Sequence, residues 1–160
     1  MDKTEIIKAE AQALLEKMID KFDLEVSRDE EVFHVVIKTE EEAPTVIGRH
    51  GETIRALQKI LEVIIYKKTN EPANVLVNVN DYREKQKERL QAIATEKAEE
   101  ARQSDAPVYF RGLSSFERRM IHEFVTASYP DLTTYSVGEG RDRRLVIEKK
   151  KAETAGQTGE

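Results

Sequence analysis

The sequence predicts an α+β protein of two small domains, and three observations support this class. The chain of 160 residues is long enough for one ordinary domain or two small ones. Apolar residues recur at helical spacing in some segments and alternate in others, so helices and strands are both expected. A highly charged helical pattern begins after residue 80 and is followed by more strands and a helix. We therefore expect domains at 1–80 and 81–151 and a disordered tail at 152–160.

A helix and a β-hairpin are expected to begin the first domain. The helix is predicted over 3–22, where apolar residues recur on one side and Glu and Lys lie opposite. Its apolar residues are Ile7, Ala11, Leu14, Leu15, Met18 and Phe22. In the hairpin, Phe33, Val35 and Ile37 alternate with the residues between them, as a strand with a buried face requires. Its strands are expected at 24–28 and 32–39, with the turn at 29–31.

Two helices and a strand are expected to complete this domain. Pro44 suits the first turn of a very short helix that ends at Gly48. A long helix is predicted over 52–68, before the break at 70–72, and a strand is predicted over 74–80. The apolar face of the long helix consists of Ile54, Leu57, Ile60, Leu61, Ile64 and Ile65.

The second domain is expected to begin with a charged helix over 82–104 and a short strand over 107–110. The helix starts near Tyr82 and has a thin apolar stripe: Leu90, Ile93, Ala94, Ala98 and Ala101. A second helix follows and runs to about Ser128, with a capping box formed by Ser114 and Glu117. Its inward residues are expected to be Phe116, Met120, Phe124 and Val125. Two strands are predicted at 132–137 and 143–148, joined by a turn at 138–142.

The most specific motif of the first domain is Val46-Ile47-Gly48-Arg49-His50-Gly51, followed by Ile54. Glycine lacks a Cβ, so the backbone can approach a ligand closely. The free amides that begin the next helix favour an anion such as a nucleic-acid phosphate. The motif and the element order resemble a type II KH domain (αββααβ), whose GxxG loop clamps single-stranded nucleotides.

This resemblance implies a nucleic-acid contact by Gly48, Arg49, His50 and Gly51. Ile47 and Ile54 are candidates for an apolar groove wall. Ile37 is a weaker candidate because a core position explains it better. A helix-starting turn with two convenient glycines is the simpler alternative.

A second candidate contact consists of Arg118 and His122, four residues apart on the capped helix. At about 100° per residue they share one face, roughly 40° apart. A guanidinium and an imidazole on one face can contact phosphate or stack on a base. The pair and its surrounding elements (helix-strand-helix-strand-strand) resemble an R-three-H domain, which is associated with single-stranded nucleic acid. Arg119 and Arg144 extend this candidate surface, whereas a solvated helix face is the simpler alternative.

A KH domain followed by an R-three-H domain resembles the bacterial Jag family, also called KhpB, EloR or SpoIIIJ-associated protein. The resemblance spans residues 1 to about 151. It implies RNA binding and a regulatory role linked to cell elongation, division and cell shape, often with a small KH-domain partner. Many members carry an N-terminal domain and linker that this sequence does not contain, which puts in doubt the functions that the family owes to that part.

The charge of the chain is unevenly distributed around a net value of −5. Residues 1–43 hold 6 basic and 13 acidic residues, a balance of −7, and residues 81–106 hold 6 and 7, a balance of −1. Residues 44–80 hold 5 and 3, a balance of +2, and residues 107–151 hold 9 and 6, a balance of +3. The two candidate sites thus lie in the positive segments. Neither segment is strongly basic, so a modest, salt-sensitive affinity is expected.

We therefore expect a non-catalytic, cytoplasmic protein that binds single-stranded RNA, with single-stranded DNA as an alternative ligand. A protein-interaction adaptor, recruiting partners through the acidic residues 1–43, is the alternative function. The chain has no cysteine, and His34, His50 and His122 show no metal-ligand spacing, so no catalytic site, metal or cofactor is expected. The acidic start is unlike a signal peptide, and no apolar run could span a membrane. Homodimerisation through 82–104 or a strand edge is left open.

Overall fold

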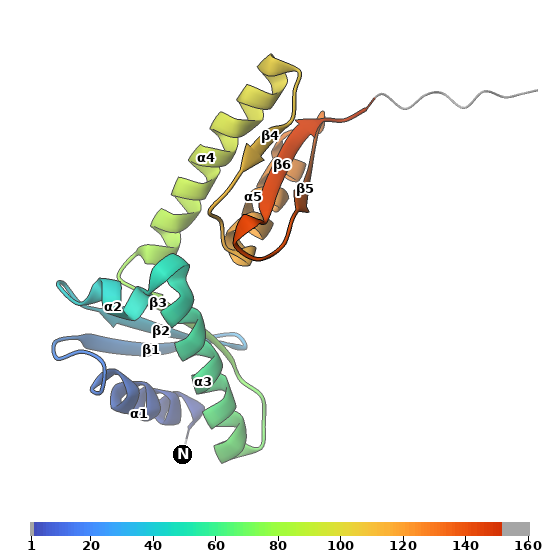
Figure 1. Ribbon diagram of the computed structural model, residues 1–160. Helices are drawn as coiled ribbons and strands as arrows, with labels where there is room; N and C mark the ends of the chain where they lie inside the picture. Colours follow the sequence, from blue (N-terminus) through green and yellow to red (C-terminus); the bar gives the residue numbers. More distant parts are fainter. Residues whose placement is uncertain (1, 152–160) are drawn as a thin grey trace, which may run out of the picture. The chain divides into compact units, whose positions relative to one another are not determined.

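The computed structural model describes residues 2–151 and divides the chain into two compact units (Figure 1). The first unit ends at Lys85 and the second begins at Gln86, so both include part of helix α4 (Tyr82–Ser104). The sequence placed the boundary between residues 80 and 81, at the start of this helix. The predicted tail, 152–160, lies outside the described residues.

The first unit has the predicted order of helices and strands. Its sheet has the order β1-β2-β3, in which β1 and β2 pair antiparallel and β2 and β3 pair parallel. The elements are α1 (Lys3–Leu15), β1 (Asp23–Asp29), β2 (Val32–Lys38), α2 (Ala43–Ile47), a 3₁₀ turn (Arg49–Gly51), α3 (Glu52–Thr69) and β3 (Asn74–Val79).

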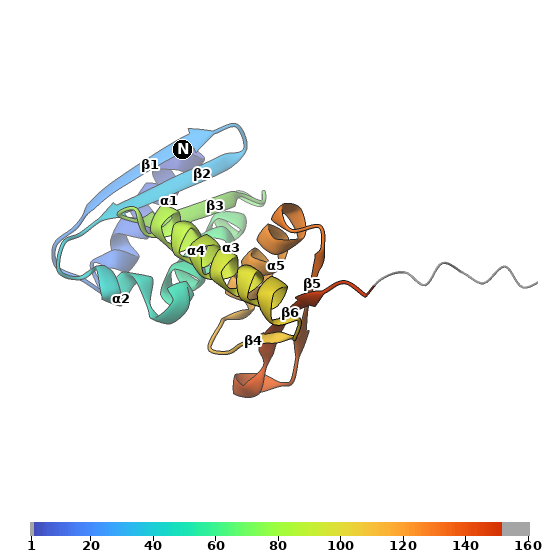
Figure 2. The ribbon, with the colours of Figure 1, turned by 90° about the horizontal axis from the view of Figure 1, so that it is seen from above.

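The core of this unit lies between the sheet and the two long helices. Figures 1 and 2 show α1 and α3 against the same face of the sheet. Alternate strand residues point into this layer because successive side chains of a strand face opposite sides. These residues are Phe33, Val35 and Ile37 of β2 and Val75, Val77 and Val79 of β3, all buried. Helices α1 and α3 contribute Ile7, Ala11, Leu15, Ile54, Leu57, Leu61 and Ile65.

Helix α1 is shorter than predicted, because it ends at Leu15 and not at residue 22. The next residues form a turn, in which the Met18 amide donates to the Leu15 carbonyl at 2.9 Å. The amides of Asp20 and Lys21 then donate to the carboxylate of Glu42, each at 3.0 Å. A side chain distant in sequence therefore takes the donors that a longer helix would pair internally, which the apolar pattern did not show.

The second unit also follows the predicted order, and this confirms the α+β class. Its sheet has the antiparallel order β4-β6-β5. The elements after α4 are β4 (Val108–Phe110), α5 (Ser115–Ser128), β5 (Leu132–Val137), a 3₁₀ turn (Gly140–Asp142) and β6 (Arg144–Lys149). The core joins the apolar stripe of α4 to one face of the sheet and to α5: Leu90, Ala94, Ala98, Ala101, Val108, Ile121, Val125, Leu132, Leu145 and Ile147.

Helix α5 has the predicted capping box, but its buried face differs from the prediction. The Ser114 side chain accepts from the Glu117 amide, and the Glu117 carboxylate accepts from the Ser114 amide. Phe116, expected inside, is 41% exposed, whereas Glu117 and Ile121 are buried. The Nε2 atom of Gln86 donates to the Glu117 carboxylate at 2.7 Å. Hydrogen bonds from protein groups therefore replace those that water would make to this carboxylate. An apolar pattern cannot predict a buried, fully paired carboxylate.

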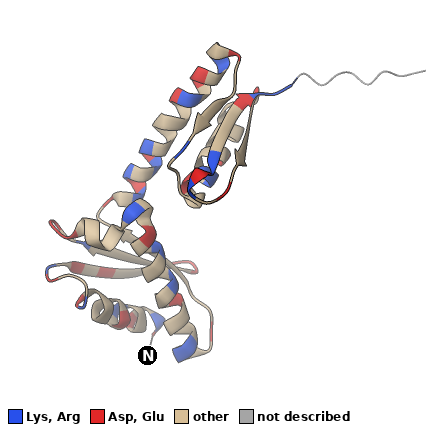
Figure 3. Cartoon of the chain, viewed as in Figure 1, with Lys and Arg blue, Asp and Glu red and all other residues tan. Residues whose placement is uncertain are grey.

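Charged residues of both signs follow one another along α4, as Figure 3 shows. The residues of α4 that point away from the second core are largely exposed. The outer face of that helix is therefore solvated.

Candidate nucleic-acid interface

The glycine loop joins α2 to α3 and has a backbone that only particular residues tolerate. Gly48, His50 and Gly51 have φ values of +71°, 54° and +73°. A Cβ on Gly48 would lie 2.2 Å from the Oγ1 of Thr53 and 2.8 Å from its backbone nitrogen. Any other residue at position 48 would therefore collide with the first turn of α3 in addition to adopting an unfavourable φ.

Two residues that the sequence did not predict support this loop. The Nη1 atom of Arg55 donates to the carbonyl of His50 at 2.7 Å, which stabilises the left-handed backbone there. Tyr82 packs against the other end of the loop. Its ring is so close to Gly51 that a Cβ added there would lie 3.3 Å from it. The sequence offered a weak signal for Arg55, one helical turn after Gly51, and none that linked Tyr82 to the loop.

The loop residues differ in what they present to solvent. Arg49 is exposed, and its side chain makes no hydrogen bond or ion pair with any other residue in the described part of the chain. His50 is half-buried, and Ile47 packs half-buried against the first core. Ile54 and Ile37 are 2% and 1% exposed and belong to that core. Of the three isoleucines, only Ile47 is thus placed beside the loop with exposed surface.

The start of α3 combines an attraction and a repulsion for anions. The first amides of the helix lack partners within it, and the helix dipole is positive at this end. Arg49 adds a full positive charge beside these amides. Glu52 is exposed in the first turn, where it stabilises the helix but repels a phosphate. The loop can therefore hold one phosphate with limited strength.

The second site centres on Arg118 and His122, which lie one turn apart on α5 and border the same shallow depression. The Nη1 of Arg118 donates to the Leu113 carbonyl at 2.7 Å, and its Nη2 donates to the Ser115 hydroxyl at 3.0 Å. The His122 Nδ1 is hydrogen-bonded to the Thr134 hydroxyl. Both side chains are thus oriented by neighbouring groups, and His122 remains exposed.

The depression is open and about 450 Å³ in volume, with residues of α5, β5 and β6 around it. It brings Arg119 and Arg143 to the same edge as Arg118. Arg119 is paired with Glu123 at 3.0 Å, and the Nη1 of Arg143 donates to the Gly138 carbonyl at 2.9 Å. The lining residues are Ser115, Arg118, Arg119, His122, Thr134, Tyr135, Ser136, Arg143 and Leu145. The sequence did not predict the contribution of β5, because the pairing of a strand with α5 depends on the tertiary fold.

Arg144 lies apart from this depression. Its guanidinium lies over the ring of Tyr109, 4.9 Å from the ring centre. Because Arg144 and Leu145 are consecutive on β6 and Leu145 points into the core, Arg144 faces the opposite side of the sheet. The structure therefore brings Arg118, Arg119 and His122 together but places Arg144 on another surface.

Tyr135 also borders the depression, and its phenol stays neutral at physiological pH. Partial burial raises its pKa above the ordinary value, and the carboxylate of Glu148 raises it further. The carboxylate of Glu148 beside this phenol disfavours a phosphate at Tyr135 itself.

Neither metal ligation nor membrane insertion is indicated by the described residues. Within 2–151, no three His, Asp or Glu side chains gather closely enough to hold a metal ion. In the same range, no helix combines the length and apolar character that a membrane span requires.

Residues 88–149 match the family profile of the R-three-H domain, so the second unit is an R-three-H domain. The chain is also 30% identical to the RNA-binding protein KhpB of Bacillus subtilis over 141 residues, which cover 88% of this chain and 67% of that protein. It is 34% identical to the KhpB of Lactiplantibacillus plantarum over 63% of this chain, and 28% identical to that of Streptococcus pneumoniae over 90%. The chain belongs to the KhpB family, and the predicted Jag-family resemblance is confirmed.

The relatives are longer than the matched region. The alignments cover 31% of the Lactiplantibacillus plantarum protein and 44% of the Streptococcus pneumoniae protein.

Proposed function

We propose that this protein is a non-catalytic regulator that binds single-stranded RNA through two separate contacts, the glycine loop and the Arg118–His122 helix. The observation that carries the proposal is the loop: a positive φ at three of its four residues presents an exposed Arg49 beside the open amides of α3. The relatives named above, all called RNA-binding proteins, support RNA as the ligand.

The first unit serves in this proposal as a type II KH domain. Its order αββααβ and its Gly48-Arg49-His50-Gly51 loop support that assignment. A phosphate of the RNA would lie beside the first amides of α3, with Arg49 and His50 next to it. The adjoining base would lie toward Ile47, the half-buried residue at the end of α2.

The R-three-H domain supplies the second contact. The side chains of Arg118 and His122 meet at one depression, where an arginine fork and an imidazole can donate to phosphate oxygens. Hydrogen bonds to Leu113, Ser115 and Thr134 hold both groups, so binding requires little further ordering.

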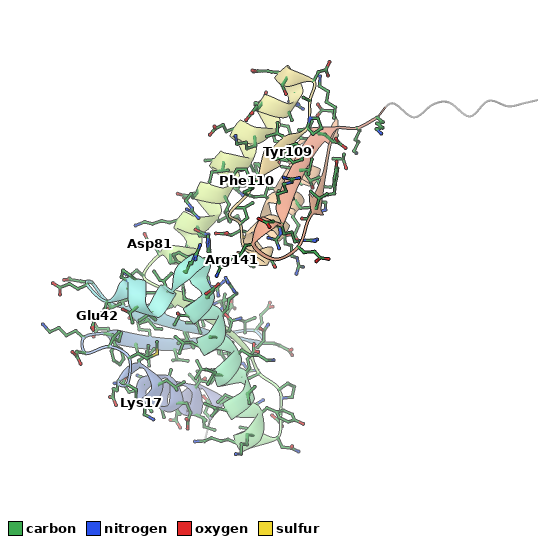
Figure 4. All side chains as sticks on the ribbon, viewed as in Figure 1. Lys17, Glu42, Asp81, Tyr109, Phe110 and Arg141 are labelled. Atoms are coloured by element: carbon green, nitrogen blue, oxygen red, sulfur yellow. The ribbon has the colours of Figure 1, made fainter. Side chains whose placement is uncertain are left out.

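The loop is tested by the double variant Arg49→Asp, His50→Asp. We expect RNA affinity to fall at least about tenfold while the melting temperature changes little, because both positions lie outside the core. The measurement is fluorescence polarisation with a labelled RNA long enough to reach both contacts. Lys17→Asp, which reverses a charge on the exposed turn after α1 (Figure 4), is the control and should bind normally. Unchanged binding by the double variant would mean that the loop is not a contact.

The same titration over a range of salt concentrations measures the electrostatic part of binding. The logarithm of affinity should fall with a slope of about −0.7 per phosphate neutralised, and the double variant should have the smaller slope. Parallel titrations with single-stranded DNA of the same sequence decide between RNA and DNA. RNA that stays intact during incubation with the protein would agree with the non-catalytic assignment.

A partner protein is the second part of this proposal. One side of α3 exposes Ile60, Val63 and Tyr66, which are 44%, 55% and 55% exposed at helical spacing. This stripe suits another KH domain, either a small partner, as in the Jag family, or a second copy of this chain. Val63→Glu should prevent that association in light scattering while leaving short-RNA binding intact. A cytoplasmic regulator of cell elongation and division is the role that this assembly would serve.

A further inference from the structure

The outer face of the second sheet presents two tyrosines that the Arg118–His122 helix does not use. The strand register places Tyr109 of β4 and Tyr135 of β5 opposite Val146 of β6, one on each side. Their neighbours along β6, Leu145 and Ile147, point into the core with α4 and α5. Because side chains alternate along a strand, the tyrosines lie on the opposite face. In Figure 1, α5 lies behind this sheet, and Figure 4 labels Tyr109 on β4.

Both tyrosine side chains are exposed to solvent in the described part of the second unit. Tyr109 is 54% exposed and Tyr135 is 43% exposed, whereas Val146 between them is only 1% exposed. The rings therefore cover the valine and present their outer surfaces to solvent. Arg144 lies 4.9 Å from the centre of the Tyr109 ring, so a cation accompanies one of the two aromatic groups.

We propose that Tyr109 and Tyr135, with Arg144, form a platform on which two unpaired bases of the bound RNA stack; this inference rests on the proposed RNA-binding function. Aromatic side chains on an open sheet bind single-stranded nucleic acid in this way, because every base has a π face. The arginine enlarges the stacking surface at Tyr109 and attracts the phosphate of the stacked nucleotide.

The spacing of the platform selects single strands. One strand separates Tyr109 from Tyr135, so their Cα atoms are roughly 10 Å apart across the sheet. Neighbouring nucleotides of one strand in a helix advance by roughly 3.4 Å. Bases that occupy both rings must therefore be unstacked from each other, which a duplex does not allow.

The platform is continuous with the Arg118–His122 depression. Tyr135 lines that depression as well as the outer face, because β5 is the edge strand beside α5. A strand whose phosphate contacts Arg118 can thus place its next base on Tyr135. Glu148, beside the phenol, would repel a phosphate there, which favours a base at this position.

The test uses the full chain and a fluorescein-labelled oligouridylate of about 12 nucleotides. Tyr109→Leu and Tyr135→Leu keep Val146 covered but remove the π face, and each should weaken binding about fivefold or more. Tyr109→Phe and Tyr135→Phe retain stacking and should bind within about twofold of the original protein. The leucine variants should leave the salt slope unchanged, because stacking releases no counterions.

Lys17→Leu is the control, since Lys17 is exposed on the turn after α1 and belongs to none of the proposed contacts. It should bind RNA normally. If the leucine variants at 109 and 135 bind normally while Arg49→Asp, His50→Asp loses affinity, the platform is wrong and the proposed function stands. If the unmodified protein binds no oligonucleotide, both are wrong. Equal losses in all three leucine variants would also overturn the platform, because the effect would not be specific to this face.

Discussion

Gly48 is the residue at which backbone conformation and packing most restrict the sequence of the loop. Its φ of +71° and the closeness of Thr53 act together, since each alone disfavours a side chain. The neighbouring His50 adopts a φ of 54° with a side chain present, supported by the bond from Arg55 to its carbonyl. The loop is therefore fixed before any ligand arrives, which lowers the entropic cost of binding.

The Gly48→Ala variant should lower the free energy of unfolding by about 2 kcal/mol or more. Gly112→Ala is its control, because Gly112 has a φ of +78° but no atom within 4 Å of the added Cβ. The control should lose only about 1 kcal/mol, the cost of the backbone conformation. Urea denaturation of both variants measures the difference. Equal losses would show that Thr53 moves away at no cost.

The sequence motif identified some residues of the loop and missed others. The sequence located Gly48 and Gly51 because the extended motif around them coincides with the element order of a KH domain. It could not locate Arg55 or Tyr82, whose roles arise from contacts across the fold. Ile54 matched a groove position in the motif, but the structure buries it in the core.

At the scale of elements, Glu117 joins α4 to the start of α5. Its carboxylate caps α5 through the Ser114 amide and accepts from Gln86, while Arg89 lies 3.4 Å away. The carboxylate is fully buried, so removal of any partner leaves a polar group without water. This junction also positions the helix that carries Arg118 and His122.

Glu117→Ala should destabilise the second unit by about 2–4 kcal/mol, because it removes a helix cap and leaves Gln86 unpaired. Glu123→Ala is the control, since Glu123 makes only an exposed ion pair with Arg119 and should cost less than about 1 kcal/mol. Thermal unfolding followed by circular dichroism measures both. A mild effect at Glu117 would indicate that water replaces its partners.

An ion pair between α4 and the start of β5 should make stability depend on acid. Two nitrogens of Arg102 contact the carboxylate of Asp131, at 2.9 and 2.5 Å, and this lowers the pKa of Asp131 below its ordinary value of 3.8. The pair therefore contributes fully above that value, and its contribution is lost as the pH falls through the lowered pKa. Asp131→Asn should lower the melting temperature at neutral pH and have a smaller effect near pH 3. A constant difference at all pH values would show that the charge is not responsible.

The element order was predictable because most helices and strands have a clear period and glycine, proline or capping residues at their ends. The end of α1 and the buried face of α5 could not be predicted in this way. In both cases a contact between residues distant in sequence decides the outcome, because Glu42 accepts from the amides after α1 and Glu117 accepts from Gln86 of α4. The same holds for the depression, since Thr134 reaches His122 only through the fold.

At the scale of the whole molecule, two modest contacts on one chain should act together. A ligand held at one site raises the effective concentration of its other end at the second site. The net charge of −5 does not prevent this, because the positive balance is concentrated in the two segments that carry the sites.

Combining the loop variant (Arg49→Asp, His50→Asp) with Arg118→Ala, His122→Ala should reveal this coupling. On an RNA long enough to reach both sites, either pair of changes alone should cost at least about tenfold in affinity. On a very short RNA, which engages one site at a time, each pair should cost much less. Calorimetry with RNAs of increasing length measures the difference. Equal losses at all lengths would mean that the sites do not share one ligand.

The support that Tyr82 gives to Gly51 has a consequence for how the protein becomes functional during synthesis. The loop lies in the connection between the parallel strands β2 and β3, so it is not enclosed until β3 has been made. Tyr82 follows three residues after β3 and belongs to the helix that leads into the R-three-H domain. The nascent chain therefore completes the glycine loop only after Tyr82 has left the ribosome, and a chain truncated before α4 would lack a finished loop.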